Sequence, residues 1–173
     1  MIKQFRDIDW NSWQPTEKAT LMFVIDNDEV LLIRKKRGLG AGKINGPGGR
    51  LEAGETIEQC AVRETQEELG VTAIKPMLQG RHKFQFSDGY ALEVFVYCTT
   101  EYSGNAIETE EAIPLWTPIN AIPYEEMWED DRIWLPKMFA GQFFDGRYLF
   151  DKDKMLGYEL DHISSTDHLL DSH

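Results

Sequence analysis

Five glutamates lie close together in the sequence between Glu55 and Glu68. Glu64 and Glu68 are four residues apart and Glu67 is three residues from Glu64, so a helix would place these three on one side. Like charges at this spacing repel one another by roughly 0.2–0.5 kcal/mol per pair. A divalent cation bound by the carboxylate oxygens, which suit Mg²⁺ or Mn²⁺, would offset that repulsion. An ordinary acidic surface helix is the alternative.

The helix that carries these glutamates has a start signal and a stop signal. Thr56, with Gln59 three residues later, fits a capping box, and Gly70 fits a left-handed helix end. No Pro or Gly lies between them, so we expect one helix of about four turns. At 100° per residue the acids extend the apolar side of this helix, with Arg63 on the opposite side. Acids in that position would line the edge of a cleft.

A glycine-rich turn, Gly46-Pro47-Gly48-Gly49, precedes the helix and allows a backbone to come close to an anion. The pattern that follows is Gly49, five residues, Glu55, seven residues, Arg63-Glu64, Glu67-Glu68 and Gly70-Val71. This pattern resembles the Nudix box, the signature of hydrolases that cleave a nucleoside diphosphate linked to another group. Thr65 stands at a packing position where the family usually has an aliphatic residue.

The resemblance implies a divalent-metal site that holds Mg²⁺ or, alternatively, Mn²⁺. The expected ligands are one backbone carbonyl and four carboxylates, those of Gly48, Glu64, Glu67, Glu68 and Glu111. Three of the carboxylates are candidates for the base that activates water: Glu64, Glu67 and Glu111. Three box positions are expected to be structural: Gly49, Glu55 and Arg63, the last two as an ion pair that orients the loop.

A second group of residues that could bind a substrate lies about 60 residues beyond the box, where Trp128 and Trp134 flank Asp130 and Asp131. Purine bases stack on indole faces for roughly 1–3 kcal/mol. Adjacent carboxylates in a partly buried site push their pKa values apart, so one can donate a proton while the other accepts. Such a pair can read the edge of a purine. The alternative is a helix with two core tryptophans and a solvated pair of acids.

Segments outside the box resemble the animal-type MutT homologues, a branch of the Nudix family that hydrolyses oxidised purine nucleoside triphosphates such as 8-oxo-dGTP. The likeness runs from about residue 20 to residue 160. It implies release of a nucleoside monophosphate and pyrophosphate. It also implies substrate-binding roles for eight residues: Lys35, Leu39, Asn45, Phe84, Trp128, Asp130, Asp131 and Trp134. Leu39 replaces an aromatic residue of those relatives and Glu129 replaces a proline, which affects the preferred base rather than the chemistry.

Other functions are open at this stage. A Nudix hydrolase of a nucleotide sugar, a dinucleoside polyphosphate or a methylated purine nucleotide would carry the same box. A non-catalytic domain that only senses nucleotide usually loses box glutamates, and this chain keeps them. The basic run from Lys35 to Arg37 is either a solvated loop or a phosphate contact.

The rest of the sequence reads mostly as strands. Extended segments are expected over residues 20–25, 30–33, 74–86, 91–99, 113–116, 143–150 and 155–160. A second helix is expected from Glu125 to Phe139, broken at Pro136. Strands around two helices predict an α+β fold with a mixed sheet, and the resemblance implies the Nudix α-β-α sandwich.

The length predicts a single domain over residues 1–173. Within it, residues 1–19 form either an extra strand or an arm packed on the domain. Residues 161–173 are rich in Asp, Ser and His, which suggests a frayed tail.

The formal net charge of −12 argues against binding to nucleic acid polymers, which requires a basic surface, and leaves a small nucleotide as the expected partner. Cys60 and Cys98 resemble neither a disulfide framework nor a zinc site. No apolar run of 18 residues is present, and charges begin at Lys3. We therefore expect a monomer in the cytoplasm that does not associate with membranes.

Overall fold

The computed structural model describes residues 1–171. Its strands are β1 (Glu17–Asp26), β2 (Glu29–Lys35), β3 (Ile44–Asn45), β4 (Gly48–Arg50), β5 (Thr72–Ile74), β6 (Met77–Phe86), β7 (Ala91–Thr99), β8 (Glu101–Ser103), β9 (Ala112–Pro118), β10 (Phe143–Asp151) and β11 (Lys154–Ile163). Its helices are α1 (Ile57–Leu69) and α2 (Asp131–Phe139), with 3-10 turns η1 (Phe5–Asp7), η2 (Ile119–Ala121) and η3 (Tyr124–Glu126). No helix in this part of the chain is long and apolar enough to cross a membrane.

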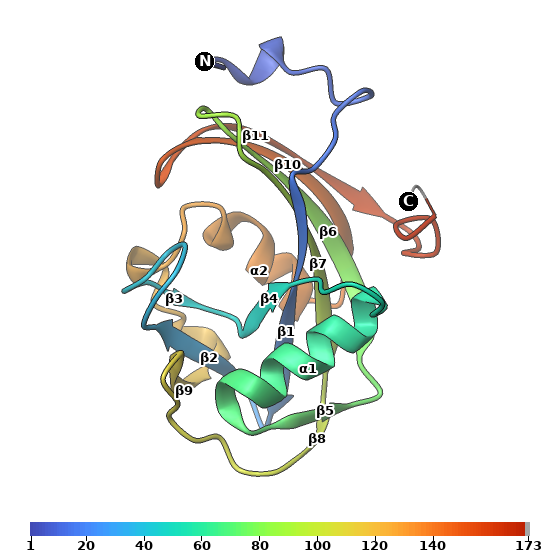
Figure 1. Ribbon diagram of the computed structural model, residues 1–173. Helices are drawn as coiled ribbons and strands as arrows, with labels where there is room; N and C mark the ends of the chain where they lie inside the picture. The colour runs from blue at the N-terminus through green and yellow to red at the C-terminus, as the bar shows by residue number, and fades with distance from the viewer. Residues whose placement is uncertain (172–173) are drawn as a thin grey trace.

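One mixed sheet organises the molecule (Figure 1). Its order is β11-β10-β6-β7-β1-β2-β3, with β4 paired to β1 and β9 paired to β2, while β5 and β8 form a separate pair. β1 runs parallel to β7 and β10 runs parallel to β6. The predicted hairpin of the first two strands is present, because β1 and β2 pair antiparallel.

The two helices cover opposite faces of this sheet. Successive side chains of a strand point to opposite faces. Phe23 of β1 packs edge-on against Trp134 of α2, with ring centroids 5.8 Å apart. Met22 and Val24 belong instead to the apolar cluster that contains Leu69 of α1. The predicted α+β fold, an α-β-α sandwich around a mixed sheet, is confirmed.

Helix α1 begins and ends where its local signals predict. Thr56 accepts the backbone N–H of Gln59, and the Gln59 side chain accepts the N–H of Thr56, so the capping box is complete. Gly70 closes the helix at φ +74°. The unusual Thr65 is fully buried, and its hydroxyl donates to the Ala61 carbonyl at 2.9 Å. That local bond satisfies the polar group at an apolar packing position.

The second helix is shorter than predicted. The chain makes the turn η3, runs extended at Met127, and becomes helical only at Asp131. Pro136 lies inside α2 on its exposed side and does not break it. The single strand predicted over residues 74–86 is also wrong, because Lys75 has φ +51° and separates β5 from β6.

The N-terminal segment is an arm packed on the domain up to Glu17, where β1 begins. Phe5 lies directly on Gly157 of β11, where an added Cβ would come within 2.6 Å of the Phe5 Cβ. Trp13 donates its indole N–H to Gln85 of β6 at 2.8 Å. The arm therefore covers the face of β6 opposite to that of Phe84, since strand residues alternate.

The predicted frayed tail is wrong for residues 161–171, and residues 172–173 lie outside the described part. Strand β11 continues to Ile163, and Leu169 is fully buried. The buried Arg81 guanidinium donates to the Leu169 carbonyl at 3.3 Å and binds Asp145 with two hydrogen bonds. A buried cation needs several acceptors, and the tail supplies one of them.

Leu169→Ala tests whether the tail stabilises the fold. Removing a buried leucine side chain leaves a cavity, so we expect the free energy of unfolding to fall by about 2–5 kcal/mol. The neighbouring Leu170 is 43% exposed, so Leu170→Ala is the matched control and should change stability by less than about 0.5 kcal/mol. Denaturant unfolding of both variants is the measurement. Equal, small effects in the two variants would show that the tail adds nothing to stability.

Candidate active site

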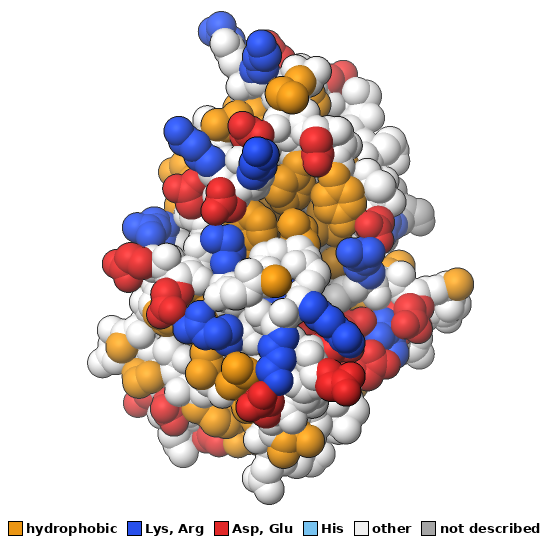
Figure 2. All heavy atoms as spheres, turned by 60° about the vertical axis from the view of Figure 1, so that its left-hand side comes forward, with side chains coloured by type: hydrophobic (Ala, Val, Ile, Leu, Met, Phe, Trp, Pro, Cys, Tyr) orange, Lys and Arg blue, Asp and Glu red, His pale blue; other side chains and the backbone are white. Residues whose placement is uncertain are grey.

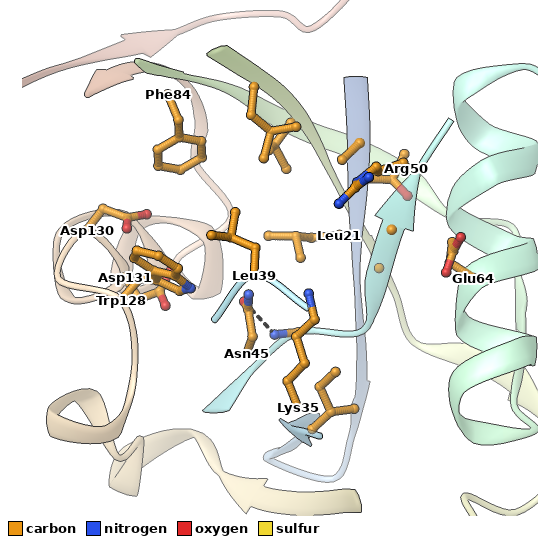
Figure 3. Close-up of a pocket in the computed structure, with 18 of the residues that line it drawn as sticks. Leu21, Lys35, Leu39, Asn45, Arg50, Glu64, Phe84, Trp128, Asp130 and Asp131 are labelled. Atoms are coloured by element: carbon orange, nitrogen blue, oxygen red, sulfur yellow. Dashed lines mark hydrogen bonds between the residues drawn. The ribbon is translucent and has the colours of Figure 1, made fainter. Parts of the chain in front are cut away.

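A cavity of about 260 Å³ lies between α1 and α2. Figure 2 shows a hollow lined by hydrophobic side chains, with acidic and basic side chains at its rim. Most of the predicted site residues line it: Lys35, Leu39, Asn45, Gly48, Gly49, Glu64, Glu68, Phe84, Glu111, Trp128, Asp130, Asp131 and Trp134. Glu55, Arg63 and Glu67 do not line it. Figure 3 shows Glu64 at one end of the cavity and Trp128, Asp130 and Asp131 at the other.

The acidic end depends on a close approach between strand β4 and helix α1. A Cβ at Gly48 would lie 1.9 Å from the Thr20 carbonyl oxygen of β1, and a Cβ at Gly49 would lie 2.3 Å from the Glu64 carboxyl carbon. At Gly48 a side chain would clash with the backbone of β1, so only glycine fits there, whereas at Gly49 a side chain would displace the Glu64 carboxylate. The backbone N–H of Gly48 donates to Glu68 at 2.7 Å, which fixes that carboxylate.

Burial changes the acidity of the two glutamates that line this end. Glu68 is only 2% exposed, and burial raises its pKa to about 8, although the Gly48 N–H lowers it. Burial also raises the pKa of Glu64, and the charges of Glu67 and Glu111 raise it further. The charge of Glu111 contributes to the raised pKa of Glu68 as well. The carboxylates are therefore near enough to repel one another.

Arg63 connects the helix to the loop before it. Its guanidinium binds both carboxylate oxygens of Glu55, at 2.7 and 2.9 Å, and lowers the pKa of Glu55 to about 2. The same side chain donates to Glu64 at 2.8 Å and to Glu67 at 3.1 Å. Arg63 therefore lies on the side of the acids, and its predicted position on the opposite side is wrong. The prediction considered only the angle of each side chain around the helix axis. Residues four apart, such as Arg63 and Glu67, are neighbours on the helix surface.

No three acidic, histidine or cysteine side chains within residues 1–171 converge in an arrangement ready to hold a metal ion. The reason is that Arg63 occupies Glu64 and Glu67, while Glu68 faces the Gly48 N–H. The donor set still fits a hard divalent cation, because it consists of oxygen atoms. A cation at this end would also favour the ionised carboxylates, offsetting the burial and the mutual repulsion that raise their pKa values.

The other end of the cavity holds two buried acids. Trp134 donates its indole N–H to Asp130 at 2.8 Å. Asp131 keeps one carboxyl oxygen, Oδ2, that is buried without a hydrogen-bond partner among the described residues. Burial raises the pKa of both carboxyls, and the charge of Asp130 raises that of Asp131 further. Burial therefore favours a proton on this pair, which would let it present both a donor and an acceptor.

Buried ring side chains pack against Trp134. His82 lies 4.4 Å from the Trp134 ring, and its Nδ1 is 3.0 Å from the Tyr148 hydroxyl. Burial lowers the pKa of His82 to about 3, so the imidazole is neutral. Tyr148 reaches this position because β10 pairs in parallel with β6. The alternation of His82 with Phe84 was visible in the sequence, whereas the pairing that brings Tyr148 was not.

Two cationic side chains, Lys35 and Arg50, line the cavity. Lys35 is the member of the basic run that lines it, because Lys36 pairs with Glu108 and Arg37 lies 3.4 Å from Glu111. Arg50 also lines the cavity, although sequence reasoning did not select it. Figure 3 shows Arg50 between Glu64 and the centre of the cavity. Its position directly after Gly49 was the signal that could have identified it.

Known proteins share both the sequence and the fold of this chain. The model of the NUDIX domain matches residues 15–138. The oxidized purine nucleoside triphosphate hydrolase of Danio rerio is 40% identical over 146 residues, which cover 83% of this chain and 94% of that protein. The Mus musculus protein of the same name is 37% identical over 148 residues, covering 84% and 95%.

A solved structure agrees with these matches. The crystal structure of the Mutator MutT protein from Bacillus halodurans superposes with a TM-score of 0.75 at 29% identity, covering 84% of this chain and 97% of that one. The predicted resemblance is thereby confirmed. Because the matches span most of the sequence and include the box that forms the acidic end of the cavity, the chain belongs to the Nudix family.

Proposed function

We propose that this protein hydrolyses oxidised purine nucleoside triphosphates such as 8-oxo-dGTP, giving the nucleoside monophosphate and pyrophosphate. Nudix hydrolases act on small nucleotides and generally use divalent metal cations. The observation that carries the proposal is the single cavity that has carboxylates of α1 at one end and a buried acid pair beside an indole at the other. The name of the 40% identical Danio rerio relative supports it.

The acid pair suits the edge of an oxidised purine. Such a base presents hydrogen-bond donors and acceptors side by side, and a protonated acid next to an ionised one can meet both. The unpartnered Oδ2 of Asp131 supports this role, because a buried oxygen without a partner is costly unless a ligand pairs it. Trp128 offers a face for stacking, Phe84 and Trp134 close the apolar walls, and Asn45 and Leu39 lie at the mouth.

The phosphates would lie between the base end and α1. Lys35 and Arg50 supply positive charge there. Glu64, Glu68 and Glu111, with the Gly48 carbonyl, would hold Mg²⁺, or Mn²⁺ in its place. The bound cation would offset the charge on the phosphates and make a bound water more acidic.

A carboxylate of this chain must accept the proton of the attacking water. Glu67 is 51% exposed, pairs with Arg63 and lies outside the cavity. Glu64 and Glu111 line the cavity, so they are the better placed candidates. Arg63 donates to the Arg50 carbonyl at 3.1 Å and to both carboxylate oxygens of Glu55, so it holds the end of β4 and the loop that follows.

We also infer that the protein is a cytoplasmic monomer that takes free nucleotides rather than nucleic acid polymers. The net charge of −12 supports the second part, because a polyanion would be repelled. Cys60 and Cys98 are free thiols, which agrees with a reducing compartment.

A comparison of substrates tests the proposal directly. The kcat/KM with Mg²⁺ should be highest for 8-oxo-dGTP and 2-hydroxy-dATP, and lower for dGTP, dTTP, methylated purine nucleotides and nucleotide sugars. Glu64→Gln and Glu68→Gln should each lower kcat at least 100-fold, since each removes a charge that the cation needs. Glu68→Gln should raise the melting temperature in EDTA, because it removes a buried carboxylate.

Glu58→Gln is the matched control, because Glu58 is an exposed acid on the same helix. It should keep wild-type turnover. A wild-type preference for nucleotide sugars would reject the proposed substrate. Retention of more than about a tenth of wild-type kcat in Glu68→Gln, worth only ~1.4 kcal/mol of barrier, would reject its role as a ligand.

Asparagine variants test the acid pair. Asp130→Asn and Asp131→Asn keep the side-chain size but end the exchange of a proton between the two groups. A mispaired edge costs several kcal/mol, so kcat/KM for 8-oxo-dGTP should fall at least 100-fold while that for dTTP changes less than about threefold. The measurement is kcat/KM for both substrates in both variants. A uniform loss would show that the pair is structural.

The proton of the acid pair also predicts a pH dependence. The folded-state pKa of Asp131 is raised, so its protonated form is present at low pH and is lost as pH rises through that pKa. The ratio of kcat/KM for 8-oxo-dGTP to that for dTTP should therefore fall as pH rises. Taking the ratio cancels the pH dependence of the shared phosphate chemistry. Asp131→Asn should flatten the curve, and an equally steep curve in that variant would contradict the assignment.

A further inference from the structure

The loop of residues 36–43 packs against the outside of the base-binding end. Gly40 has φ +81°, and a Cβ there would lie 2.8 Å from the Trp128 indole nitrogen, so the loop touches the ring directly. The ammonium of Lys43 lies over the same ring, 5.3 Å from its centroid. Trp128 lines the cavity and Lys43 does not. The cation therefore contacts the indole from outside the cavity.

Lys43 is held in this position from several directions. Its N–H donates to the Gly40 carbonyl at 2.9 Å, and its carbonyl accepts from the N–H of Lys35 at 3.0 Å. Its ammonium lies 3.6 Å from Asp153, in the turn between β10 and β11. The Asp153 side chain is largely exposed, so this ion pair alone contributes little. The ammonium thus lies between the Asp153 carboxylate and the indole.

Trp128 also packs against the apolar cluster that contains Trp134. Phe86 and Phe150 meet it edge-on, with centroids 6.3 and 5.5 Å away. The next residue, Glu129, accepts the backbone N–H of Met155 at 2.6 Å, which ties the segment to β11. These contacts fix the ring edges and the backbone. Lys43 is the cation that the structure places over the ring among the described residues.

We propose that Lys43 is a positioning residue for base recognition, which acts through Trp128 by holding its indole at the angle on which the purine stacks. The inference rests on the proposed function, because it assigns the stacking face to a purine. The charge of Lys43 has a separate effect on the neighbouring acid pair, because it lowers the pKa of Asp131, which burial and the charge of Asp130 raise. Glu129 is the other charged group at this pair.

The test compares Lys43→Met and Lys43→Arg with a matched control. Methionine keeps the length of the side chain and removes the charge, whereas arginine keeps a cation that binds aromatic faces. Lys83 also lies over an indole, that of Trp13, at 5.7 Å, but on the opposite face of the sheet. Lys83→Met therefore makes the same chemical change away from the cavity.

Lys43→Met should raise KM for 8-oxo-dGTP and dGTP about three- to tenfold, the range of a partly desolvated cation–π contact, with kcat within twofold of wild type. The affinity for 8-oxo-dGMP in EDTA, measured by calorimetry, should fall by the same factor. Lys43→Arg should restore both quantities to within twofold, and Lys83→Met should change neither. The binding measurement reports on the base end alone, because it needs no turnover.

Three results would overturn the inference. They are an unchanged KM in Lys43→Met, a loss confined to kcat, and equal losses in Lys43→Met and Lys43→Arg. A wild-type enzyme that neither hydrolyses 8-oxo-dGTP nor binds 8-oxo-dGMP would reject the proposed function, and this inference with it. That outcome is distinct, because it shows in the wild type before any variant is compared.

Discussion

The contact between strand β4 and helix α1 is the constraint on which the site depends. A side chain at Gly48 would clash with the backbone of β1, and a side chain at Gly49 would displace the Glu64 carboxylate. Burial beside this contact raises the pKa of Glu68, although the hydrogen bond from the Gly48 N–H lowers it. Buried, mutually repelling acids reduce the stability of a fold. Such buried acids at this contact fit a site in which the compensating positive charge is supplied by a cation that binds with the substrate.

The same physical effect serves two different purposes at the two ends of the cavity. At the α1 end, burial raises carboxyl pKa values in a place open to a cation, which would restore the ionised form. At the α2 end, Asp130 and Asp131 are buried behind Trp134 and Trp128, and burial raises the pKa of Asp131 although the charge of Lys43 lowers it. There the proton itself is the useful feature, because it turns one acid into a donor. Phosphate chemistry and base recognition can therefore share one cavity.

The parts that could be predicted from sequence were those set by local signals. Thr56, Gln59 and Gly70 define α1 through contacts within a few residues, and the box spacing follows from that helix. The start of α2 at Asp131, the position of Arg63 and the buried Leu169 could not be predicted. Each depends on packing between segments that are distant in sequence, or on which of several partners a long side chain selects.

The same distinction explains Arg50 and Tyr148. Arg50 faces the cavity because β4 pairs with β1, and Tyr148 reaches His82 because β10 pairs in parallel with β6. Parallel pairing between strands separated by about 60 residues leaves no mark in the pattern of either strand. The sequence alone identified the residues whose role follows from the motif. It did not identify the residues on other strands that contact them.

The two departures from the animal-type relatives lie at the mouth of the cavity and its supports, not at its floor. Leu39 is an exposed residue at the rim, where an aromatic side chain would cover more of a bound base. Glu129 uses its carboxylate to hold the backbone of Met155, a bond that proline could not make. Neither residue belongs to the carboxylates of α1 or to the acid pair, although the charge of Glu129 helps to raise the pKa of Asp130. Differences in base preference are therefore expected to come from the cover of the mouth and from the charge beside Asp130, while the phosphate chemistry stays that of the family.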